Sequence, residues 1–454
     1  MSSGIAAPGR PLAPLRYPAF RAIWIANFAS NIGSMIQSVG AAWLMTDLTR
    51  SHQLIALVQS STTLPVLLLG VFAGAIADNY DRRLVMLAAQ WMMLAASALL
   101  ALLAWSGGIG PFSLLAFTLL VGCGTALNGP AWQASVRLQV GPGELAQAIS
   151  LNTIAFNLAR SVGPALGGIL IALASPALAF ALNALSFVAL IVVLWRWRPD
   201  LARPDRARPD RSKKDLAQTG QQAPGHAPRA RQSMLASIAT GLRFCRSSSP
   251  VRRVLVRGFA FGFGGVGFLA LLPVVVRSQM HGTELDYGLL LGAFGLGSIL
   301  TALWVAPLRR RFGSETVVGA ATLLFAAALL PIAAAHSLAP ALAAALVAGG
   351  SWVATLTTLN VAMQLRSPEA ILGRCLAIYQ SVTFGGMALG AYTLGVLADL
   401  ISVAGAIRTA AAVLLVSLPL LRWLAPMPAR DEGRLGVVPA EPSGSEAADT
   451  GGAT

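Results

Sequence analysis

Twelve apolar segments of about 18 to 25 residues dominate this sequence and limit what it can fold into. A helix of about 20 apolar residues is long enough to cross the hydrocarbon core of a bilayer. Charged residues make up only 11% of the chain, roughly half the share found in soluble proteins. The chain therefore has too few polar side chains to cover a water-soluble particle, and we expect an all-α membrane protein embedded in a lipid bilayer.

The apolar segments fall into two sets of six, separated by a long polar segment. The first set lies near 20–46, 53–77, 84–105, 112–136, 147–173 and 176–195, and the second near 254–278, 286–307, 315–335, 339–363, 370–397 and 403–424. Residues 128–152 and 359–380 resemble each other, about half a chain apart. Such internal repeats predict twelve transmembrane helices in two symmetry-related six-helix bundles.

The basic residues are distributed unevenly between the two sides of the predicted membrane. Placing the N-terminus in the cytoplasm puts 29 of the 33 basic residues on the cytoplasmic side. Only Arg50, Arg277 and Arg408 then lie outside, and Arg160 falls within a span. Cytoplasmic loops of membrane proteins carry this excess of Lys and Arg. We therefore expect a multi-pass protein of the inner (plasma) membrane with both termini cytoplasmic, and we do not take the net charge of +15 as a sign of nucleic-acid binding.

These patterns divide the chain into five regions. They are a cytoplasmic N-terminal tail (1–19), an N-terminal six-helix bundle (20–195), a cytoplasmic basic linker (196–253), a C-terminal six-helix bundle (254–424) and a disordered cytoplasmic tail (425–454). The Pro-rich part of the linker, 196–232, cannot bury a core. Apolar residues then recur at helical spacing over 233–247, which fits either an amphipathic helix on the inner membrane face or a linker helix packed on the bundle.

The loop after the second span reads GAIADNYDRR and resembles a signature loop of the major facilitator superfamily. Gly74, Asp78, Arg82 and Arg83 match the signature, whereas Asp81 replaces its usual glycine. The resemblance implies a latch that holds one of two alternating conformations. The physical basis would be close helix approach at the glycine and pairing of the carboxylate with a helix N-terminus. An ordinary solvated charged turn is the alternative.

The fifth span contains GPALGG, which resembles a superfamily motif associated with exporters. The residues concerned are Gly163, Pro164, Gly167 and Gly168. Glycines let helices approach closely, and proline removes a backbone donor and bends its helix. Small-residue packing without a role in transport is the alternative.

Arg160 lies in the same span, one turn before this motif. A charged side chain inside a membrane is costly, so it is a candidate for binding an anionic substrate group, with a structural ion pair or carbonyl contact as the alternative. Amides provide further candidates for lining a substrate cavity, or alternatively for hydrogen bonding between helices. They are Asn27, Asn31, Gln37 and Asn157.

Proton coupling requires a titratable group that both sides of the membrane can reach. No Asp or Glu lies centrally in a predicted span, but Asp47 ends the first span and Asp399 ends the eleventh. We identify these two as candidates for proton coupling, with helix capping as the alternative.

Signatures of enzymes, cofactors and metal sites are absent from the sequence. The only lysines, Lys213 and Lys214, lie in the linker, so no phosphate-binding P-loop exists. The three cysteines are far apart and have no nearby histidines. We therefore expect a monomeric non-enzyme without cofactor or metal, whose partners are a small-molecule substrate and protons.

The resemblance to the major facilitator superfamily covers about 16–424. NGPAWQASV, FNLARSVGPALGG and GLRFCRSSSPVRRVL resemble the transmembrane secretion effector subfamily, which includes the enterobactin exporter. This resemblance implies proton-driven export of siderophores, drugs or secondary metabolites by alternating access. An importer on the same fold is the alternative. A lipid-handling enzyme or a sensor is a third hypothesis, and it would require a catalytic cluster that the sequence does not show.

Overall fold

The computed structural model describes residues 12–197, 234–368 and 371–428, and throughout these ranges the regular structure is helical. The first half contains α1 (Pro18–Leu48), α2 (His52–Asn79), α3 (Arg82–Ser106), α4 (Pro111–Ser135), α5 (Leu145–Leu173) and α6 (Pro176–Arg196). The second half contains α8 (Met234–Ser247), α9 (Ser249–Val274), α10 (Glu284–Ala333), α11 (Leu338–Leu365), α12 (Leu372–Leu400) and α13 (Val403–Leu424). Short turns are η1 (Ala13–Arg16), η2 (Val136–Leu138), η3 (Pro142–Glu144) and the π-helical η4 (Val275–Gln279). Most of the predicted linker and tail lies outside the described residues.

The described helices agree with twelve membrane spans. Ten are long and apolar enough to cross a bilayer by composition, and α1 adds a further helix of 31 residues. The 50-residue α10 contains Gly313 at a positive φ of 80°, where the chain turns back on itself. Val305 before this turn and Ala321 after it pack together against Ala354 of α11. α10 is therefore a hairpin of two spans, and the prediction of an all-α membrane fold is confirmed.

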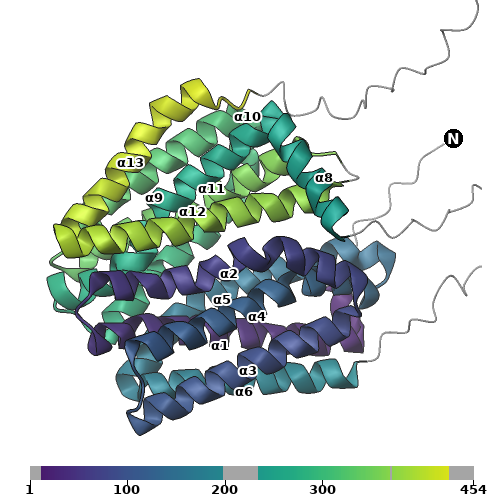
Figure 1. Cartoon of the computed structure of the whole chain (residues 1–454), viewed down its shortest axis with the longest axis horizontal. Helices are drawn as coiled ribbons and strands as arrows, with labels where there is room; N and C mark the ends of the chain where they lie inside the picture. Colours follow the sequence, from purple (N-terminus) through teal and green to yellow (C-terminus); the bar gives the residue numbers. More distant parts are fainter. Residues whose placement is uncertain (1–11, 198–233, 369–370, 429–454) are drawn as a thin grey trace, which may run out of the picture.

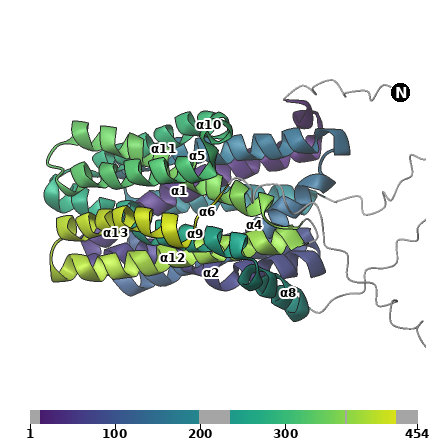
Figure 2. The ribbon, with the colours of Figure 1, turned by 90° about the horizontal axis from the view of Figure 1, so that it is seen from above.

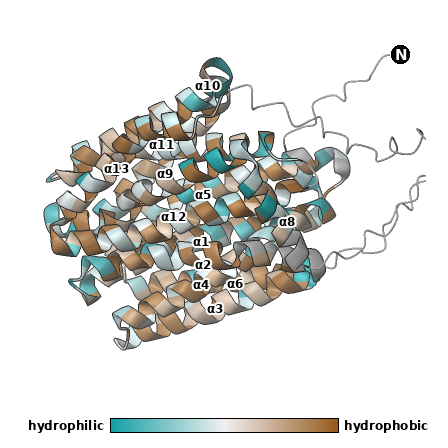
Figure 3. Ribbon diagram, turned by 45° about the horizontal axis from the view of Figure 1, so that its top comes forward, coloured by the Kyte–Doolittle hydropathy of each residue, from teal (hydrophilic) through white to brown (hydrophobic). Residues whose placement is uncertain are grey.

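Several helices begin at residues that favour a helix N-terminus, namely serine and proline. Ser51, Ser175 and Ser402 each accept a hydrogen bond from a backbone N–H in the first turn of the helix that follows. Pro18 and Pro111 occupy first-turn positions, where the missing N–H has no intrahelical partner to lose. Apolar colour follows the length of the helices and hydrophilic colour gathers at their ends (Figure 3).

The helices form two bundles that lie side by side, α1–α6 in one and α9–α13 in the other (Figure 1). In the view from above the second bundle lies over the first (Figure 2). Two helix pairs provide most of the contact between them, α2 with α12 and α5 with α10. We call the end where α1 begins and α6 ends the linker end, and α8 lies there too. The opposite end, where α1 ends and α2 begins, is the far end.

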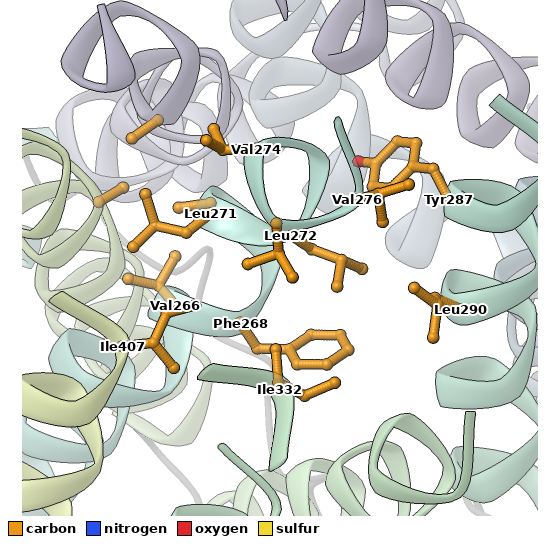
Figure 4. Close-up of a cluster of buried hydrophobic side chains, with 14 of the residues drawn as sticks. Val266, Phe268, Leu271, Leu272, Val274, Val276, Tyr287, Leu290, Ile332 and Ile407 are labelled. Atoms are coloured by element: carbon orange, nitrogen blue, oxygen red, sulfur yellow. The ribbon is translucent and has the colours of Figure 1, made fainter. Parts of the chain in front are cut away.

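Buried side chains join the two bundles at the far end and leave them separate at the linker end. One apolar cluster runs from Ile36 and Val58 of the first bundle to Phe268, Leu290 and residues throughout the second. Its C-terminal part, built around the far half of α9, is drawn in Figure 4. Near the linker end the clusters each belong to one bundle. The bundles are therefore sealed together over their far halves only.

Helix α8 packs on the linker end of the second bundle. A Cβ at Gly241 would lie 3.1 Å from the Cβ of Arg374 and 3.3 Å from Cδ1 of Ile378, both on α12. Cys245 is 3% exposed and shares an apolar cluster with Cys375. Interaction with the Cys375 thiol and burial raise the pKa of the Cys245 thiol well above its usual range.

Candidate transport site and gates

Arg160 lies near the middle of α5, on the seam where the two bundles meet. Its guanidinium carbon is 6.0 Å from the ring centre of Phe294 on α10 and 6.0 Å from that of Trp352 on α11. The side chain is half-buried and makes no hydrogen bond or ion pair with any residue that the structure describes. A cationic group of the first bundle thus meets aromatic rings of the second, at distances typical of cation–π contacts.

The aromatic rings facing Arg160 belong to a larger cluster in the second bundle. Trp352 packs against three rings with centres 5.5 to 6.0 Å away, those of Phe261, Phe294 and Phe325. Trp352 is 2% exposed, and its Nε1–H is buried without an acceptor in the described structure. The indole N–H is therefore unsatisfied in the buried aromatic cluster, where a polar group is costly to leave without a partner.

The backbone around Arg160 is adapted to a close approach of α10. Pro164 has no N–H, so the carbonyl oxygen of Arg160 loses its partner within α5. A Cβ at Gly295 would come within 3.0 Å of this oxygen, and one at Gly288 within 2.9 Å of the Pro164 oxygen. Glycines on α10 therefore let its backbone pass directly over these carbonyls.

The glycines of the α5 motif divide between two neighbouring helices. A Cβ at Gly163 would lie 2.6 Å from the Cβ of Met35, and one at Gly167 would lie 3.1 Å from the Cα of Ile36, both on α1. At Gly168 a Cβ would lie 2.7 Å from the carbonyl oxygen of Glu284 at the start of α10. Gly163 and Gly167 thus set packing inside the first bundle, whereas Gly168 sets the contact between bundles.

The amide candidates have different surroundings. Gln37 is 4% exposed, and its Oε1 accepts a hydrogen bond of 2.8 Å from Nδ2 of Asn183 on α6, so it links two helices of one bundle. Asn27, Asn31 and Asn157 are half-buried. These three remain predictions for a substrate path.

A first contact at the far end connects α1 with the start of the second bundle. Asp47 pairs with Arg277 of η4 at 2.6 Å, and the Arg277 guanidinium lies 5.2 Å from the Trp43 ring centre. Trp43 is 1% exposed and donates from Nε1 to Glu284 at 2.9 Å. Its ring stacks on Tyr287 with centres 6.0 Å apart. We call Trp43, Asp47, Arg277, Glu284 and Tyr287 the first far-end gate.

A second contact at the far end connects α12 with the N-terminus of α2. The Asp399 carboxylate accepts hydrogen bonds from the backbone N–H groups of His52 and Gln53, at 2.8 and 3.0 Å, and from the Ser51 hydroxyl. His52 Nδ1 lies 3.0 Å from the same carboxylate. Asp399 thus caps a helix of the other bundle, where a negative charge is stabilised by the helix dipole. Ser51, His52, Gln53 and Asp399 form the second far-end gate.

The signature loop lies at the linker end of α2, beyond a contact of α2 with α12. Gly70 and Ser381 mark that contact, because a Cβ at Gly70 would lie 3.2 Å from the Ser381 hydroxyl oxygen. A Cβ at Gly74 would meet nothing within 4 Å. The side chain of Asp78 lies outside the described residues. The glycine of the proposed latch is therefore not in contact with α12 in this conformation.

The remaining loop residues bind within the first bundle. Arg82 donates to the carbonyl oxygen of Ala134 at the end of α4, at 3.3 Å. Arg83 donates to the carbonyl oxygens of Leu194 and Trp195 at the end of α6, at 2.8 and 2.6 Å. Two arginines thus hold the negative ends of two helices.

Asp81, where the sequence departs from the superfamily signature, is the N-cap of α3. Its side chain accepts a 2.8 Å hydrogen bond from the backbone N–H of Arg83. Aspartate is among the best residues for this position because it satisfies a donor that the helix leaves free. The departure therefore replaces a flexible turn residue with a helix-stabilising one.

Sequence reasoning missed several residues of this site. Arg277 and Glu284 were visible only as charges at span ends, and Trp352 as one apolar residue among many. A buried ion pair also escaped notice: Arg257 is 5% exposed and donates to Glu315 at 2.6 Å, and Glu315 accepts from the Met427 backbone N–H at 2.7 Å. In the sequence, the only indication of these ion pairs was that their charged residues lie near the ends of predicted spans.

Two helical bundles sealed at one end and separate at the other, with a charged side chain on the seam, define the class of major facilitator transporters. Residues 9–435 match the family model of transmembrane secretion effectors, and the protein belongs to this family. It is a multi-pass membrane protein.

Proteins similar to this chain include efflux pumps and siderophore transporters. The chain is 26% identical to the enterobactin exporter EntS of Shigella boydii, over 89% of this chain and 91% of that one. It is 25% identical to the multidrug efflux pump Tap of Mycobacterium tuberculosis, over 85% and 88%. It is 22% identical to the staphyloferrin A transporter of Staphylococcus aureus, over 67% and 71%.

Solved structures share the fold at low sequence identity. A bacterial homologue of the human lysosomal transporter Spinster, in an inward-facing and unoccupied conformation, superposes with a TM-score of 0.70 at 13% identity, covering 94% of this chain and 99% of that one. The nucleoside transporter NupG gives a TM-score of 0.67 at 13% identity, covering 89% and 99%.

Proposed function

We propose that this protein is a secondary active transporter that exports a small molecule by alternating access. The observation that supports this most is the position of Arg160, at the boundary between the sealed far half of the seam and the separate linker half. A substrate bound there reaches the linker end in this conformation, and the far end once the gates open. Rocking of one bundle against the other exchanges the two openings.

We place the linker end in the cytoplasm of a bacterial-type inner membrane. The excess of Arg and Lys at this end supports the placement, because cytoplasmic loops carry such an excess. The conformation described is then inward-facing, ready to accept a substrate made in the cell. Export also fits the efflux and siderophore-export relatives.

We infer that Asp47 and Asp399 couple transport to protons. Each carboxylate holds a group of the other bundle at the far end, Asp47 facing Arg277 beside Glu284, and Asp399 facing the α2 N-terminus and His52. A proton arriving from the far side neutralises either carboxylate and removes the charge-assisted part of its hydrogen bonds. The gate then opens more readily, so inward proton movement favours the state that releases substrate outside.

Transport by the purified protein in liposomes tests this proposal. We expect a candidate drug or siderophore to move only when a pH gradient is imposed, and an uncoupler to abolish the movement. Liposomes without protein are the control. A solute that moves equally well without any gradient would contradict proton coupling.

A deletion strain distinguishes export from import. Substrate accumulates inside cells that have lost an exporter, whereas it fails to enter cells that have lost an importer. Restoring the wild-type chain should reverse the accumulation. Reduced uptake in the deletion strain would show that the importer hypothesis is correct.

A further inference from the structure

We propose that the turn of α10 binds the headgroup of an anionic phospholipid in the leaflet at the linker end. Arg309, Arg310 and Arg311 hold the phosphate, and Trp304 lies at the level where acyl chains meet headgroups. The site is on the outer surface of the second bundle. The inference goes beyond the proposed transport function and does not depend on it.

The first step concerns unpaired charge at the turn. Glu284 at the start of α10 belongs to the first far-end gate, so the turn at Gly313 lies at the linker end, where α10 is coloured hydrophilic (Figure 3). The side chains of 309–311 make no hydrogen bond or ion pair with any residue that the structure describes. By contrast, Arg83 and Arg257 at the same end donate to protein acceptors. Three adjacent positive charges are therefore without a protein partner in the described ranges.

The second step concerns the nearest acid in the sequence, Glu315, which is already paired. Its Oε1 accepts from Arg257 at 2.6 Å, and its Oε2 accepts from the Met427 backbone N–H at 2.7 Å. Both carboxylate oxygens are thus engaged inside the second bundle. The guanidinium groups at the turn are left for an external anion, and phosphate is an anion whose oxygens match the arrangement of guanidinium N–H groups.

The third step concerns the side of α10 that leads to the turn. Leu296, Leu300 and Trp304 recur every four residues with exposed fractions of 47%, 49% and 65%, and Arg311 continues this face two helical turns later. At the level of Leu296 the bundles are in contact, because Gly295 lies against the backbone of α5. The exposed stripe there faces outward to lipid and not into an opening between the bundles.

The arginines and the apolar stripe meet at the turn. The guanidinium carbon of Arg311 lies 5.3 Å from the ring centre of Phe312, which is 51% exposed. Tryptophan favours the membrane–water interface, and a long cationic side chain placed beyond it reaches the headgroup phosphates. A phospholipid matches both features, with its phosphate on the arginines and its acyl chains along the leucines. A free phosphate ion matches only the charge.

The chain's own C-terminal tail is the competing partner for the arginines. Asp431 and Glu432 follow closely after the last described residue and carry the opposite charge. A lipid is favoured because the residues around these two acids, 429–434, include no large apolar side chain to place on the exposed stripe. The full-length variant Asp431→Asn, Glu432→Gln separates the two partners, and it should bind lipid like the wild type.

Native mass spectrometry of the purified full chain in detergent measures lipid binding directly. Phosphatidylglycerol is the anionic probe, and zwitterionic phosphatidylcholine is the neutral one. We expect the wild type to bind phosphatidylglycerol more tightly. The triple variant Arg309→Gln, Arg310→Gln, Arg311→Gln should bind it about tenfold or more weakly, since each arginine near an anionic surface contributes about fivefold. Its affinity for phosphatidylcholine should stay unchanged.

Further variants complete the design. The corresponding triple lysine variant keeps the charge and should retain most of the affinity for phosphatidylglycerol. The control Arg243→Gln, Arg246→Gln, Arg252→Gln removes three exposed arginines at the same end and should bind phosphatidylglycerol like the wild type. Trp304→Ala should weaken binding of both lipids, because it removes the interfacial ring. Size-exclusion chromatography checks that each variant is folded.

Four results would overturn the inference. Equal affinity of the wild type for the two lipids would remove the preference for an anion. Equal loss in the two triple glutamine variants would indicate general attraction of charge. A marked gain of phosphatidylglycerol binding after neutralisation of the two tail acids would assign the arginines to the tail. Displacement of the lipid by an equal concentration of soluble glycerophosphoglycerol would identify a free phosphate ester as the ligand.

Discussion

Single charged residues at the far end connect the two bundles of this transporter. Asp47 and Asp399 were candidates for proton coupling because each ends a predicted span and no acid lies centrally in one, with helix capping as the alternative. Asp399 does cap a helix, but the helix is α2 of the other bundle. The cap therefore also joins the two bundles, and we expect neutralisation of this carboxylate to favour their separation at the far end.

Asp399→Asn should open the far end. The variant keeps a hydrogen-bonding side chain but loses the charge that strengthens its bonds to the α2 N-terminus. A loss of about 1 to 2 kcal/mol shifts a two-state equilibrium about 5- to 30-fold. The measurement is the rate at which a water-soluble maleimide labels Val58→Cys, which is 5% exposed in the sealed half, after Cys123, Cys245 and Cys375 are replaced by serine.

Asp286→Asn is the matched control for this prediction. Asp286 accepts from the backbone N–H and the hydroxyl of Thr283, so it also caps a helix at the far end, but within one bundle. Labelling of Val58→Cys should stay slow in this control. Equal acceleration in both variants would show that general destabilisation, and not gate opening, exposes the site.

Acidifying the far side should open the far end, as Asp399→Asn should. Protonation removes the carboxylate charge at Asp47, so labelling of Val58→Cys should accelerate relative to labelling of Gly74→Cys at the linker end as the pH falls toward about 4. The ratio of the two rates is used because the reactive thiolate fraction itself falls with pH. Asp47→Asn should raise this ratio at neutral pH and abolish its dependence on pH. A pH response of the ratio that survives in Asp47→Asn would assign the coupling group elsewhere.

Asp81→Ala should destabilise the fold through loss of the α3 N-cap. Such substitutions cost about 1 kcal/mol, whereas Asp81→Asn keeps an acceptor and Asp81→Gly costs only a few tenths. Unfolding of the purified protein in increasing sodium dodecyl sulfate measures the free energy. Equal stability of the alanine and asparagine variants would mean that the cap hydrogen bond contributes nothing.

At the scale of elements, α5 packs against α1 within its own bundle and against α10 of the other bundle. Its sequence predicted close approach and a bend but not which neighbour each glycine faces. That assignment depends on how α5 is rotated against α1 and α10, which is set by packing across the whole chain. Likewise Arg160 stood out because intramembrane charge is rare, whereas Trp352, in a distant segment of the other bundle, carried no local signal.

Alanine substitutions of two α5 glycines should have different effects. Gly163→Ala places a methyl group against Met35 inside the first bundle, and should lower stability by about 1 to 3 kcal/mol, as overpacking does. Gly168→Ala places one against the backbone of α10 and should push the bundles apart at the far end. Detergent unfolding should report the first effect and labelling of Val58→Cys the second. Interchangeable results for the two variants would contradict this division of roles.

At the scale of the whole molecule, the apolar segments of the sequence were sufficient to predict the all-helical membrane fold. They could not predict which conformation the chain adopts. The same spans serve an outward- and an inward-facing arrangement, and the difference lies in a few contacts between residues far apart in sequence. The shared apolar cluster of the far half and the separate clusters of the linker half define the conformation described.

Cysteine accessibility should show this asymmetry directly. A water-soluble maleimide should label Gly74→Cys, next to open space at the linker end, at least tenfold faster than Val58→Cys in the same cysteine-free background. Both variants lie on α2, so the comparison keeps the helix constant. Equal rates would show that the resting protein does not favour the conformation sealed at the far end.

The one-residue turn at Gly313 limits how the second bundle can move. Its positive φ lets α10 reverse direction without a loop, so the span that contacts α5 and the span that follows it have no slack chain between them. Any shift of the first span, which carries Phe294, must pull the second, which carries Phe325, and both rings contact Trp352. A displacement of Phe294 beside Arg160 is therefore expected to reach Phe325 in the core of the second bundle by two routes, through the turn and through Trp352.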